Sequence, residues 1–156
     1  MKIIADLQIH SRFSRATSPS ITLSNLEKYA RLKGLNLLGT GDFTHPKWLY
    51  ELKSELKEDG SGILKSKSGF NFVLQGEISN IYTQDGKGRR VHTLLLARNF
   101  EIVEQINAAL LKKGRLDYDG RPIFGFSCIE LVEMMKEIDE HIEIIPAHAW
   151  TPWYGL

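Results

Sequence analysis

The chain has 156 residues, a formal net charge of +1 and a hydrophobic content of 42%, which indicates one soluble globular domain with a core of ordinary size. This charge excludes a general electrostatic field directed at nucleic acid or membranes, so any DNA binding would depend on local basic clusters. Cys128 is the only cysteine, which excludes an intramolecular disulfide and a cysteine-based zinc ribbon. No apolar run approaches the roughly 20 residues of a membrane span, and the N-terminus does not resemble a signal peptide, so we expect a cytoplasmic protein.

The first apolar segment, residues 1–5, predicts a short buried strand. Asp6, Gln8 and His10 follow at alternate positions, and side chains two apart on a strand point to the same side. Buried polar groups need partners, and a metal ion would be one. The alternative is a strand that ends in a loop with a structural histidine.

The next predicted elements are a polar loop, a helix and a second buried strand. Arg12 and Arg15 lie in the serine-rich loop, where they would either contact phosphates or be solvated. Ser24 and Glu27 have the spacing of a capping box, which predicts the start of a helix. Residues 35–40 then predict the second strand.

Further polar residues follow this second strand. Asp42 and His45 would be delivered to the same end of the sheet as His10. Two nearby glycines suggest a dinucleotide fingerprint, but Thr44 occupies the position of the third glycine, which disfavours a Rossmann site. Residues 47–58 predict a helix.

Residues 70–83 predict a long strand that carries Glu77 in an apolar setting, where a carboxylate needs a partner. A turn at residues 85–88 would lead into another buried strand, residues 92–97, which begins with His92. In a regular hairpin with this turn, Glu77 and His92 would lie about four residues apart on one face, on the order of 13 Å. They could then share a metal ion only if a bulge or a wide loop brought them together.

The last third of the chain predicts two helices and a strand. Residues 101–113 have an apolar stripe, and Ser127 with Glu130 has the capping-box spacing for the second helix. The strand at residues 142–147 is followed by His148, so once more a strand delivers a histidine at its end.

The alternation of strands and helices predicts an α/β fold with mostly parallel strands. In barrels of this class, active groups gather at the C-terminal ends of the strands. Five polar residues fall at such ends: Asp6, Gln8, His10, Asp42 and His148. A collection of His, Asp and Glu at strand ends is typical of a metal site, and mixed imidazole and carboxylate ligands suit zinc, manganese or iron better than calcium.

Several motifs, in order along the whole chain, resemble those of the PHP (polymerase and histidinol phosphatase) superfamily: Asp6-Leu7-x-Ile9-His10, Gly41-Asp42-Phe43, Gly76-Glu77, His92-Thr93-Leu94-Leu95-Leu96-Ala97 and Pro146-Ala147-His148. Residues 11–16, 38–46 and 146–153 are similar to the endonuclease Q branch, which cleaves DNA on the 5′ side of deaminated bases. The resemblance implies a metal-dependent phosphoesterase with a distorted (β/α)7 barrel. Residues 1–156 would form the N-terminal portion of that domain, with about five of its strands.

The resemblance also implies a set of metal-site residues. The metal ligands would be His10, Asp42, Glu77, His92 and His148, and the catalytic centre would include Asp42, Glu77 and His148. Asp6 would orient His10 from outside the ligand set, and Gln8 and His45 would be outer partners or weak ligands. The implied cofactor is a divalent transition metal, with zinc favoured over manganese.

The implied partner is DNA that contains deaminated bases. Arg12, Arg15 and Lys47 would approach its phosphates. Trp150 and Trp153 would stack on an exposed base, unless they pack beneath the incomplete barrel.

Two departures from the family pattern affect the expected activity. The first motif of the family is His-x-His, and Gln8 takes the place of its first histidine. The chain also stops at Leu156, before the last barrel motif. We therefore expect metal binding by Glu77, His92 and His148 but poor cleavage of DNA by this chain alone.

Other interpretations stay open. The chain could be a catalytically degenerate fragment with a structural or DNA-binding role, or a small-molecule phosphatase of the histidinol phosphatase type. An open barrel would expose the strand at residues 142–147 as an edge, which could support self-association.

Overall fold

The structure is a computed structural model that describes residues 2–155. Within this range the chain forms eight strands and four helices, in the order β1 (Ala5–Asp6), α1 (Leu23–Leu32), β2 (Leu37–Gly39), α2 (Pro46–Glu55), β3 (Lys57–Glu58), β4 (Leu64–Lys65), β5 (Asn71–Gln84), β6 (Lys87–Ala97), α3 (Phe100–Leu111), β7 (Ile123–Phe124), α4 (Cys128–Ile138) and β8 (Glu143–Pro146). None of these helices is long and apolar enough to cross a membrane. The fold is mixed α/β, as the alternation of elements predicts.

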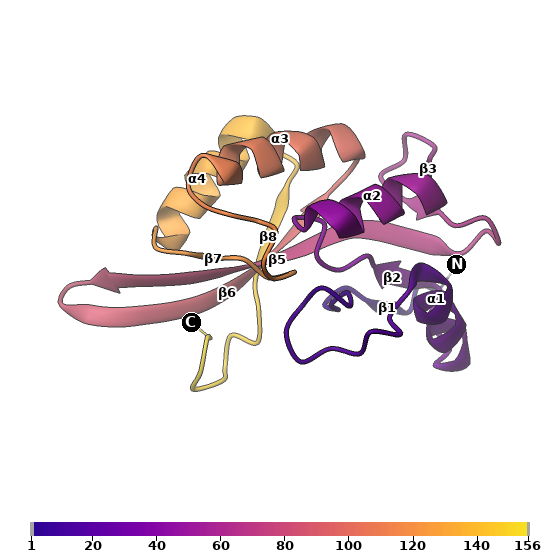
Figure 1. The fold of residues 1–156 in the computed structure, drawn as a ribbon, viewed down its shortest axis with the longest axis horizontal. Coiled ribbons are helices and arrows are strands. Elements are labelled where there is room, and N and C mark those ends of the chain that lie inside the picture. Colours follow the sequence, from indigo (N-terminus) through magenta and orange to yellow (C-terminus); the bar gives the residue numbers. More distant parts are fainter. Residues whose placement is uncertain (1, 156) are drawn as a thin grey trace.

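The long strand β5 organises the sheet (Figure 1). Its first residues pair in parallel with β2, which pairs in turn with β1, and they pair antiparallel with β4. From Leu74 to Gln84, β5 pairs antiparallel with β6, and β6 pairs antiparallel with β8. The short strand β7 pairs in parallel with the middle of β5. This single strand therefore connects the N-terminal strands to the C-terminal ones.

The sheet is less parallel than the sequence predicts. The pairs β1–β2, β2–β5 and β5–β7 are parallel, whereas β3–β4, β4–β5, β5–β6 and β6–β8 are antiparallel. The main reason is the β5–β6 hairpin, because a tight turn can join only antiparallel strands. Among the described residues, β1 pairs with β2 alone and β8 pairs with β6 alone. These strands form an open sheet, and its assignment as part of a distorted (β/α)7 barrel stays a prediction.

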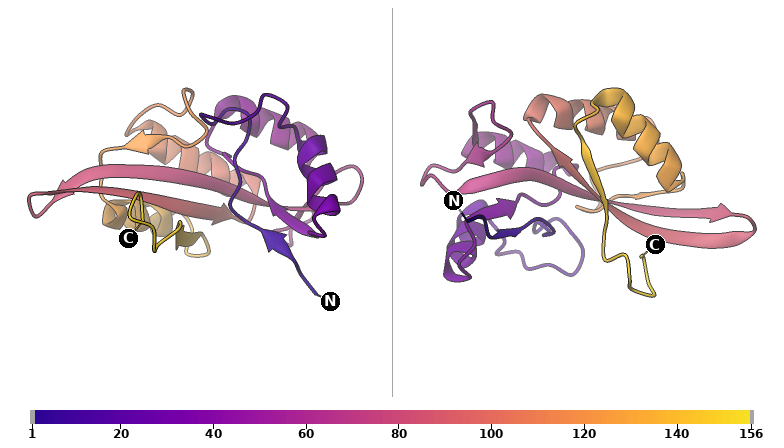
Figure 2. Two further views of the ribbon diagram at one scale, coloured as in Figure 1. Left: turned by 90° about the horizontal axis from the view of Figure 1, so that it is seen from below. Right: turned by 180° about the vertical axis from the view of Figure 1, so that it is seen from behind.

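Helices α2, α3 and α4 lie on one side of the β5–β6 ribbon, while α1 lies on the other side beside β1 and β2 (Figures 1 and 2). The segment that follows β8 leaves on the side opposite α3 and α4. The predicted stripe of α3 is confirmed, because its apolar residues are buried in one core with those of α4 and the ribbon: Ile102, Val103, Ile106, Leu110, Leu131, Met135, Leu74, Ile78 and Leu95.

One of the two predicted helix starts is confirmed and the other is wrong. Ser127 precedes α4 and accepts a hydrogen bond from Glu130 N. The N-cap of α1 is Thr22 rather than Ser24. This start places Leu23 in the first turn, where it is buried.

The first strand is shorter and more exposed than predicted. Met1 lies outside the described residues, and β1 covers only Ala5–Asp6. Ile3 and Ile4 are 62% and 42% exposed. The alternation of residues 6, 8 and 10 on a strand is therefore lost, because residues 7–10 form a loop.

Candidate functional site

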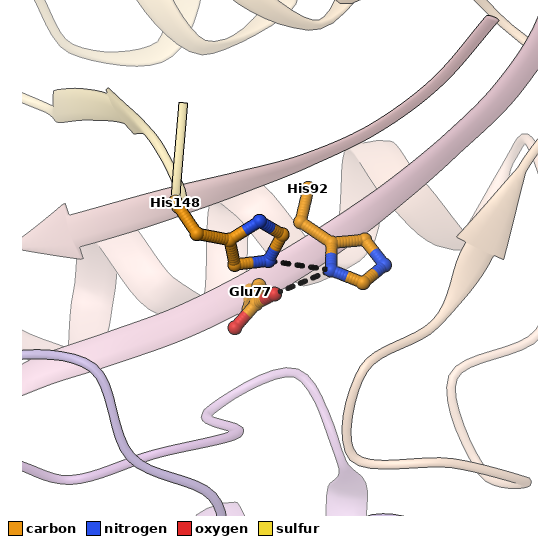
Figure 3. Close-up of side chains that lie close together, drawn as sticks. All are labelled: Glu77, His92 and His148. Carbon is orange, nitrogen blue, oxygen red and sulfur yellow. Dashed lines mark hydrogen bonds and ion pairs between the residues drawn. The ribbon is translucent and has the colours of Figure 1, made fainter. Parts of the chain in front are cut away.

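Glu77, His92 and His148 form a compact cluster of metal-ligating side chains (Figure 3). Each offers one ligand atom, and the three atoms lie within 4.8 Å of one another. His92 Nδ1 lies 3.0 Å from Glu77 Oε1 and 3.2 Å from His148 Nε2. Glu77 and His92 are buried whereas His148 is exposed, so an ion or substrate would approach past His148.

The geometry of the hairpin explains why Glu77 and His92 meet. Asp85 and Gly86 have φ values of 52° and 72°, and a two-residue type I′ turn requires positive φ at both positions. This turn places Ser79 opposite His92, so Glu77 is only two residues away along the ribbon, on the same face. The predicted offset of about four residues is wrong because it assumed a longer turn, and no bulge is needed.

His148 reaches the cluster because β8 pairs with β6. Ala147 N donates a hydrogen bond to His92 O over 2.9 Å. His148 itself has a φ of 33°, a left-handed conformation that is uncommon for residues with a side chain. Its Nδ1 lies 3.0 Å from Thr151 Oγ1, which leaves Nε2 facing the cluster.

A second group, His10 and Asp42, lies on the other side of Glu77. His10 Nδ1 is 2.9 Å from Asp42 Oδ1, and His10 Nε2 is 3.4 Å from Glu77 Oε2. Asp42 Oδ2 accepts hydrogen bonds from Ser11 N over 2.6 Å and from Ser14 Oγ over 2.9 Å. Asp42 is fully buried and held by these bonds, so it orients His10 toward Glu77.

The structure therefore gives Asp42 the role predicted for Asp6. Asp6 Oδ1 accepts a hydrogen bond from Gln8 N over 3.2 Å, and the strand ends before it could align Asp6 with His10. The side chain of Gln8 does reach the site, where its Nε2 donates to Glu77 Oε2 over 3.4 Å. Gln8 therefore contributes a neutral amide to the site.

Two residues that the motifs did not identify position the His10–Asp42 group. Gln75 Oε1 accepts hydrogen bonds from Ile9 N over 3.2 Å and from Gly41 N over 3.1 Å, which joins the two loops that carry His10 and Asp42. Gln75 precedes Glu77 by two residues on the same strand, so the alternation of β5 is the signal that could have found it.

Gly120 is the second such residue. A Cβ atom at this position would overlap Asp42 Oδ2 and Ser14 Oγ. Gly120 N donates to Phe13 O over 3.0 Å, which holds the backbone close to Asp42. Nothing in the sequence distinguishes this glycine from the other glycines between α3 and α4.

The charges of the site stabilise one another. Burial alone would raise the pKa of Glu77, but hydrogen bonds from His10 and His92 and the charge of Arg121 outweigh it and hold the pKa well below its usual range. Arg121 Nη1 lies 3.4 Å from Glu77 Oε1. Hydrogen bonds to Asp42 and Glu77 raise the pKa of His10 to about 9 despite its burial. Without a bound ion, Glu77 is an anion near neutral pH and His10 is a cation.

The donor set of the cluster fits a divalent transition metal. Imidazole nitrogens and carboxylate oxygens are ligands of zinc and manganese, and two ring nitrogens face each other here beside a carboxylate. Ser79 lies opposite His92, and its buried hydroxyl has no hydrogen-bond partner among residues 2–155. A buried hydroxyl without a protein partner can bind a water molecule or an ion beside it.

His45 lies beneath the site and does not join either group. The residue is 4% exposed, and its ring stacks on Phe13 with a centroid distance of 4.3 Å. Burial lowers the pKa of His45. Pro46 begins α2 immediately afterwards, and the helix start directs the imidazole into the core.

The two arginines expected to contact DNA phosphates both have protein partners. Arg12 forms an ion pair with Glu51 and donates to Ile21 O over 3.0 Å. Arg15 is 76% exposed at its side chain and pairs with Asp119 over 3.2 Å. Arg12 therefore holds the loop to α2, whereas Arg15 keeps most of its surface accessible.

The other residues expected to contact DNA are exposed. Lys47 lies on the surface of α2. Trp150 is 99% exposed and Trp153 is 71% exposed. Neither tryptophan packs beneath the sheet, so both indoles are accessible in this structure.

Two solved structures of similar sequence are endonucleases. The lesion-specific endonuclease PfuEndoQ of Pyrococcus furiosus is 36% identical over 97% of this chain, with a TM-score of 0.84. Endonuclease Q in complex with a 27-mer duplex substrate, with an abasic lesion at the active site, is 37% identical over 96% of this chain, with a TM-score of 0.81.

An uncharacterized protein of Methanocaldococcus jannaschii is also similar, with 35% identity over 148 residues or 94% of this chain. No family model matches the chain. The chain spans only 36% and 35% of the two endonuclease chains and 16% of the Methanocaldococcus protein.

Proposed function

We propose that residues 1–156 are the N-terminal portion of a PHP-type domain and contribute the metal site of a DNA-repair endonuclease. The reaction would be hydrolysis of the phosphodiester on the 5′ side of a deaminated base. The observation that carries this proposal is the Glu77–His92–His148 cluster, whose ligand atoms lie within 4.8 Å of one another in a chain similar in fold to endonuclease Q.

Glu77, His92 and His148 would hold one ion, with zinc favoured and manganese as the alternative. A divalent ion of this kind lowers the pKa of a coordinated water and neutralises charge that develops on a phosphate. Thr151 fixes the ring of His148 through Nδ1, and this contact supports the ligating tautomer in the way that outer partners of metal-bound histidines do.

The residues around the cluster would bind and orient the phosphate. Arg121 lies beside Glu77, and its side chain is 36% exposed, so the guanidinium can offer hydrogen bonds to a phosphate oxygen. His10 is held by Asp42 with Nε2 toward Glu77. It can donate a hydrogen bond to the substrate or ligate a second ion.

Gln8 supports the expectation of one strongly bound ion. An ion held near His10 would have the amide of Gln8 where the family has an imidazole, and a neutral amide oxygen is the weaker ligand for zinc. Hydrolysis by two ions needs both the attacking and the leaving oxygens to be stabilised. Slow cleavage is therefore expected. Gln8 also favours a second candidate function, in which the chain binds DNA without catalysis.

The first test measures metal content. The chain is incubated with zinc or manganese, freed of excess ion and analysed by elemental analysis, beside His148→Ala and His141→Ala. His141 is an exposed histidine outside the cluster and serves as the matched control. We expect one tightly bound ion in the wild type and in His141→Ala, and none in His148→Ala. No bound metal at any stoichiometry in the wild type would refute the metal site.

The second test measures nicking of duplex DNA that contains one deoxyuridine, with zinc, manganese or magnesium supplied. We expect slow nicking 5′ to the uracil that disappears in His148→Ala. Gln8→His should raise the metal stoichiometry. If both the wild type and Gln8→His bind metal and DNA but do not nick the DNA, the result would support the non-catalytic function.

A further inference from the structure

The outer part of the β5–β6 hairpin, residues 81–91, extends beyond the helices (Figures 1 and 2); we call it the arm. It has three basic residues, Lys87, Arg89 and Arg90, and one acidic residue, Asp85, so its net charge is +2, whereas the whole chain has a net charge of +1. The arm is therefore a local basic cluster on a nearly neutral protein.

The arginines of the arm differ from all the others. Every arginine outside the arm forms an ion pair with a carboxylate: Arg12, Arg15, Arg31, Arg98, Arg115 and Arg121. The ion pairs among residues 2–155 include neither Arg89 nor Arg90, and both are exposed. These two guanidinium groups are free to bind an anion from outside the chain.

A groove of about 400 Å³ lies between the arm and residues 152–155. Its lining includes Tyr82, Arg89 and Arg90 from the arm and Trp153 and Tyr154 from the facing segment. Trp153 is 71% exposed. The lining of the groove thus includes two unpaired arginines, which are adjacent on β6 and so point to opposite faces of the strand, and an accessible aromatic side chain.

The groove adjoins the metal cluster. The ring of Tyr154 stacks on His92 with a centroid distance of 4.2 Å, and His92 N donates to Tyr154 O over 3.0 Å. Arg90 lies two residues from His92 on β6, so the two side chains share a face of the ribbon. A polyanion that follows this face from Arg90 would reach the cluster.

We infer that this groove binds one nucleotide of a nucleic-acid strand whose neighbouring phosphate lies at the Glu77–His92–His148 cluster. Arginines bind phosphates through paired hydrogen bonds, and aromatic side chains stack on unpaired bases. The volume falls within the range of small-ligand pockets, as a single extruded nucleotide requires. An acidic peptide would satisfy the arginines but leaves the exposed indole without a role. This inference depends on the proposed function in one respect only, the position of the neighbouring phosphate at the Glu77–His92–His148 cluster.

The test is the binding of a fluorescently labelled single-stranded oligonucleotide by the 156-residue chain, measured by anisotropy in EDTA over a range of salt concentrations. We compare Arg89→Ala/Arg90→Ala with Lys57→Ala/Lys67→Ala, which removes the same charge from exposed positions outside the arm. Loss of two phosphate contacts should reduce the slope of log K against log salt by about 1.4. The dissociation constant should rise by at least about tenfold at about 50 mM salt.

Two further variants test the chemistry of the groove. Arg89→Lys/Arg90→Lys should keep most of the salt slope, because the charges remain. Trp153→Ala should weaken binding about fivefold or more through loss of stacking. Tyr29→Ala, which removes an exposed aromatic side chain of α1 outside the groove lining, should leave binding unchanged.

The outcomes separate this inference from the proposed function. Arm-dependent binding without metal-dependent nicking would support the groove and count against the endonuclease. If the wild type nicks DNA but the arm variant and the lysine control bind DNA equally well, the groove inference is overturned. The proposed endonuclease function would then still be supported. Tighter arm-dependent binding of a polyglutamate peptide than of the oligonucleotide would also overturn it.

Discussion

The two groups on either side of Glu77 are built on different principles. In the His10–Asp42 group, Asp42 is buried and both of its oxygens accept hydrogen bonds. In the Glu77–His92–His148 cluster, two ring nitrogens face each other, the hydroxyl of Ser79 has no partner among the described residues, and His148 is exposed. The first group is complete without a ligand and the second is not. Substitutions in the first should therefore change stability, and substitutions in the second should change metal binding.

Asp42→Ala should have the largest effect on the metal-free chain. It leaves Ser11 N and Ser14 Oγ without their acceptor and removes the carboxylate that stabilises His10, and such a loss from a buried network costs about 3–5 kcal/mol of unfolding free energy. Urea denaturation in EDTA measures it. Asp6→Ala is the control, expected within about 0.5 kcal/mol of the wild type. Equal effects of the two variants would show that the Asp42 network is not structural.

His148→Ala should show the opposite behaviour. Without metal its stability should stay within about 0.5 kcal/mol of the wild type, because the side chain is exposed. With zinc at about 100 times the dissociation constant, the wild type should gain about 2.7 kcal/mol and the variant nothing. Thermal denaturation with and without zinc measures the difference, and His141→Ala should keep the full gain. A zinc-dependent gain in His148→Ala would place the ion elsewhere.

Gly120→Ala tests the packing around Asp42. The added methyl group overlaps Asp42 and Ser14, and overpacking of this kind costs about 1–3 kcal/mol. The zinc-dependent gain should persist, because the cluster lies on the other side of Glu77. Gly88→Ala is the control, since a Cβ there has nothing within 4 Å. An unchanged stability in Gly120→Ala would mean that the His10–Asp42 group tolerates displacement.

The smallest effect is the pH dependence of the metal-free chain. The pKa of His10 is about 9 in the folded chain, against about 6.5 when unfolded. The folded state therefore binds the extra proton between these values, so stability is fully present below about pH 6.5 and falls as the pH rises through about 9. We expect a loss of about 1 kcal/mol after screening of the partly exposed ring. His10→Asn should lack this loss, and an identical pH profile would contradict the assignment.

The sequence predicts the helices and most strands because their patterns are local. The stripe of α3 repeats with the helical period, and Ser127 caps α4 as its spacing indicates. His10 and His148 both follow strands, and this position predicts that they lie close to one site; the structure places His10 beside Glu77 and His148 beside His92. These are features that a few neighbouring residues determine.

The errors concern relations between segments that are distant in the chain. The distance between Glu77 and His92 depends on the length of the turn at Asp85, where a change of one or two residues shifts every pair in the ribbon. The partner of His10 is Asp42 rather than Asp6 because a packed loop, not an alternating strand, sets the contact. Gly120 approaches Asp42 from a segment far along the chain, and no local pattern reveals that approach.

The positions of Glu77, His92 and His148 also determine when the proposed metal site would form during folding. Glu77 and His92 belong to one hairpin, which can form locally within about 1–10 μs. His148 joins only after α3, α4 and β8 have followed, and closing that long loop carries an entropic cost. A cobalt ion added during refolding would therefore acquire its third protein ligand at the docking of β8. A change in the absorption spectrum of the cobalt ion would therefore report the docking of β8, separately from the earlier formation of the β5–β6 hairpin.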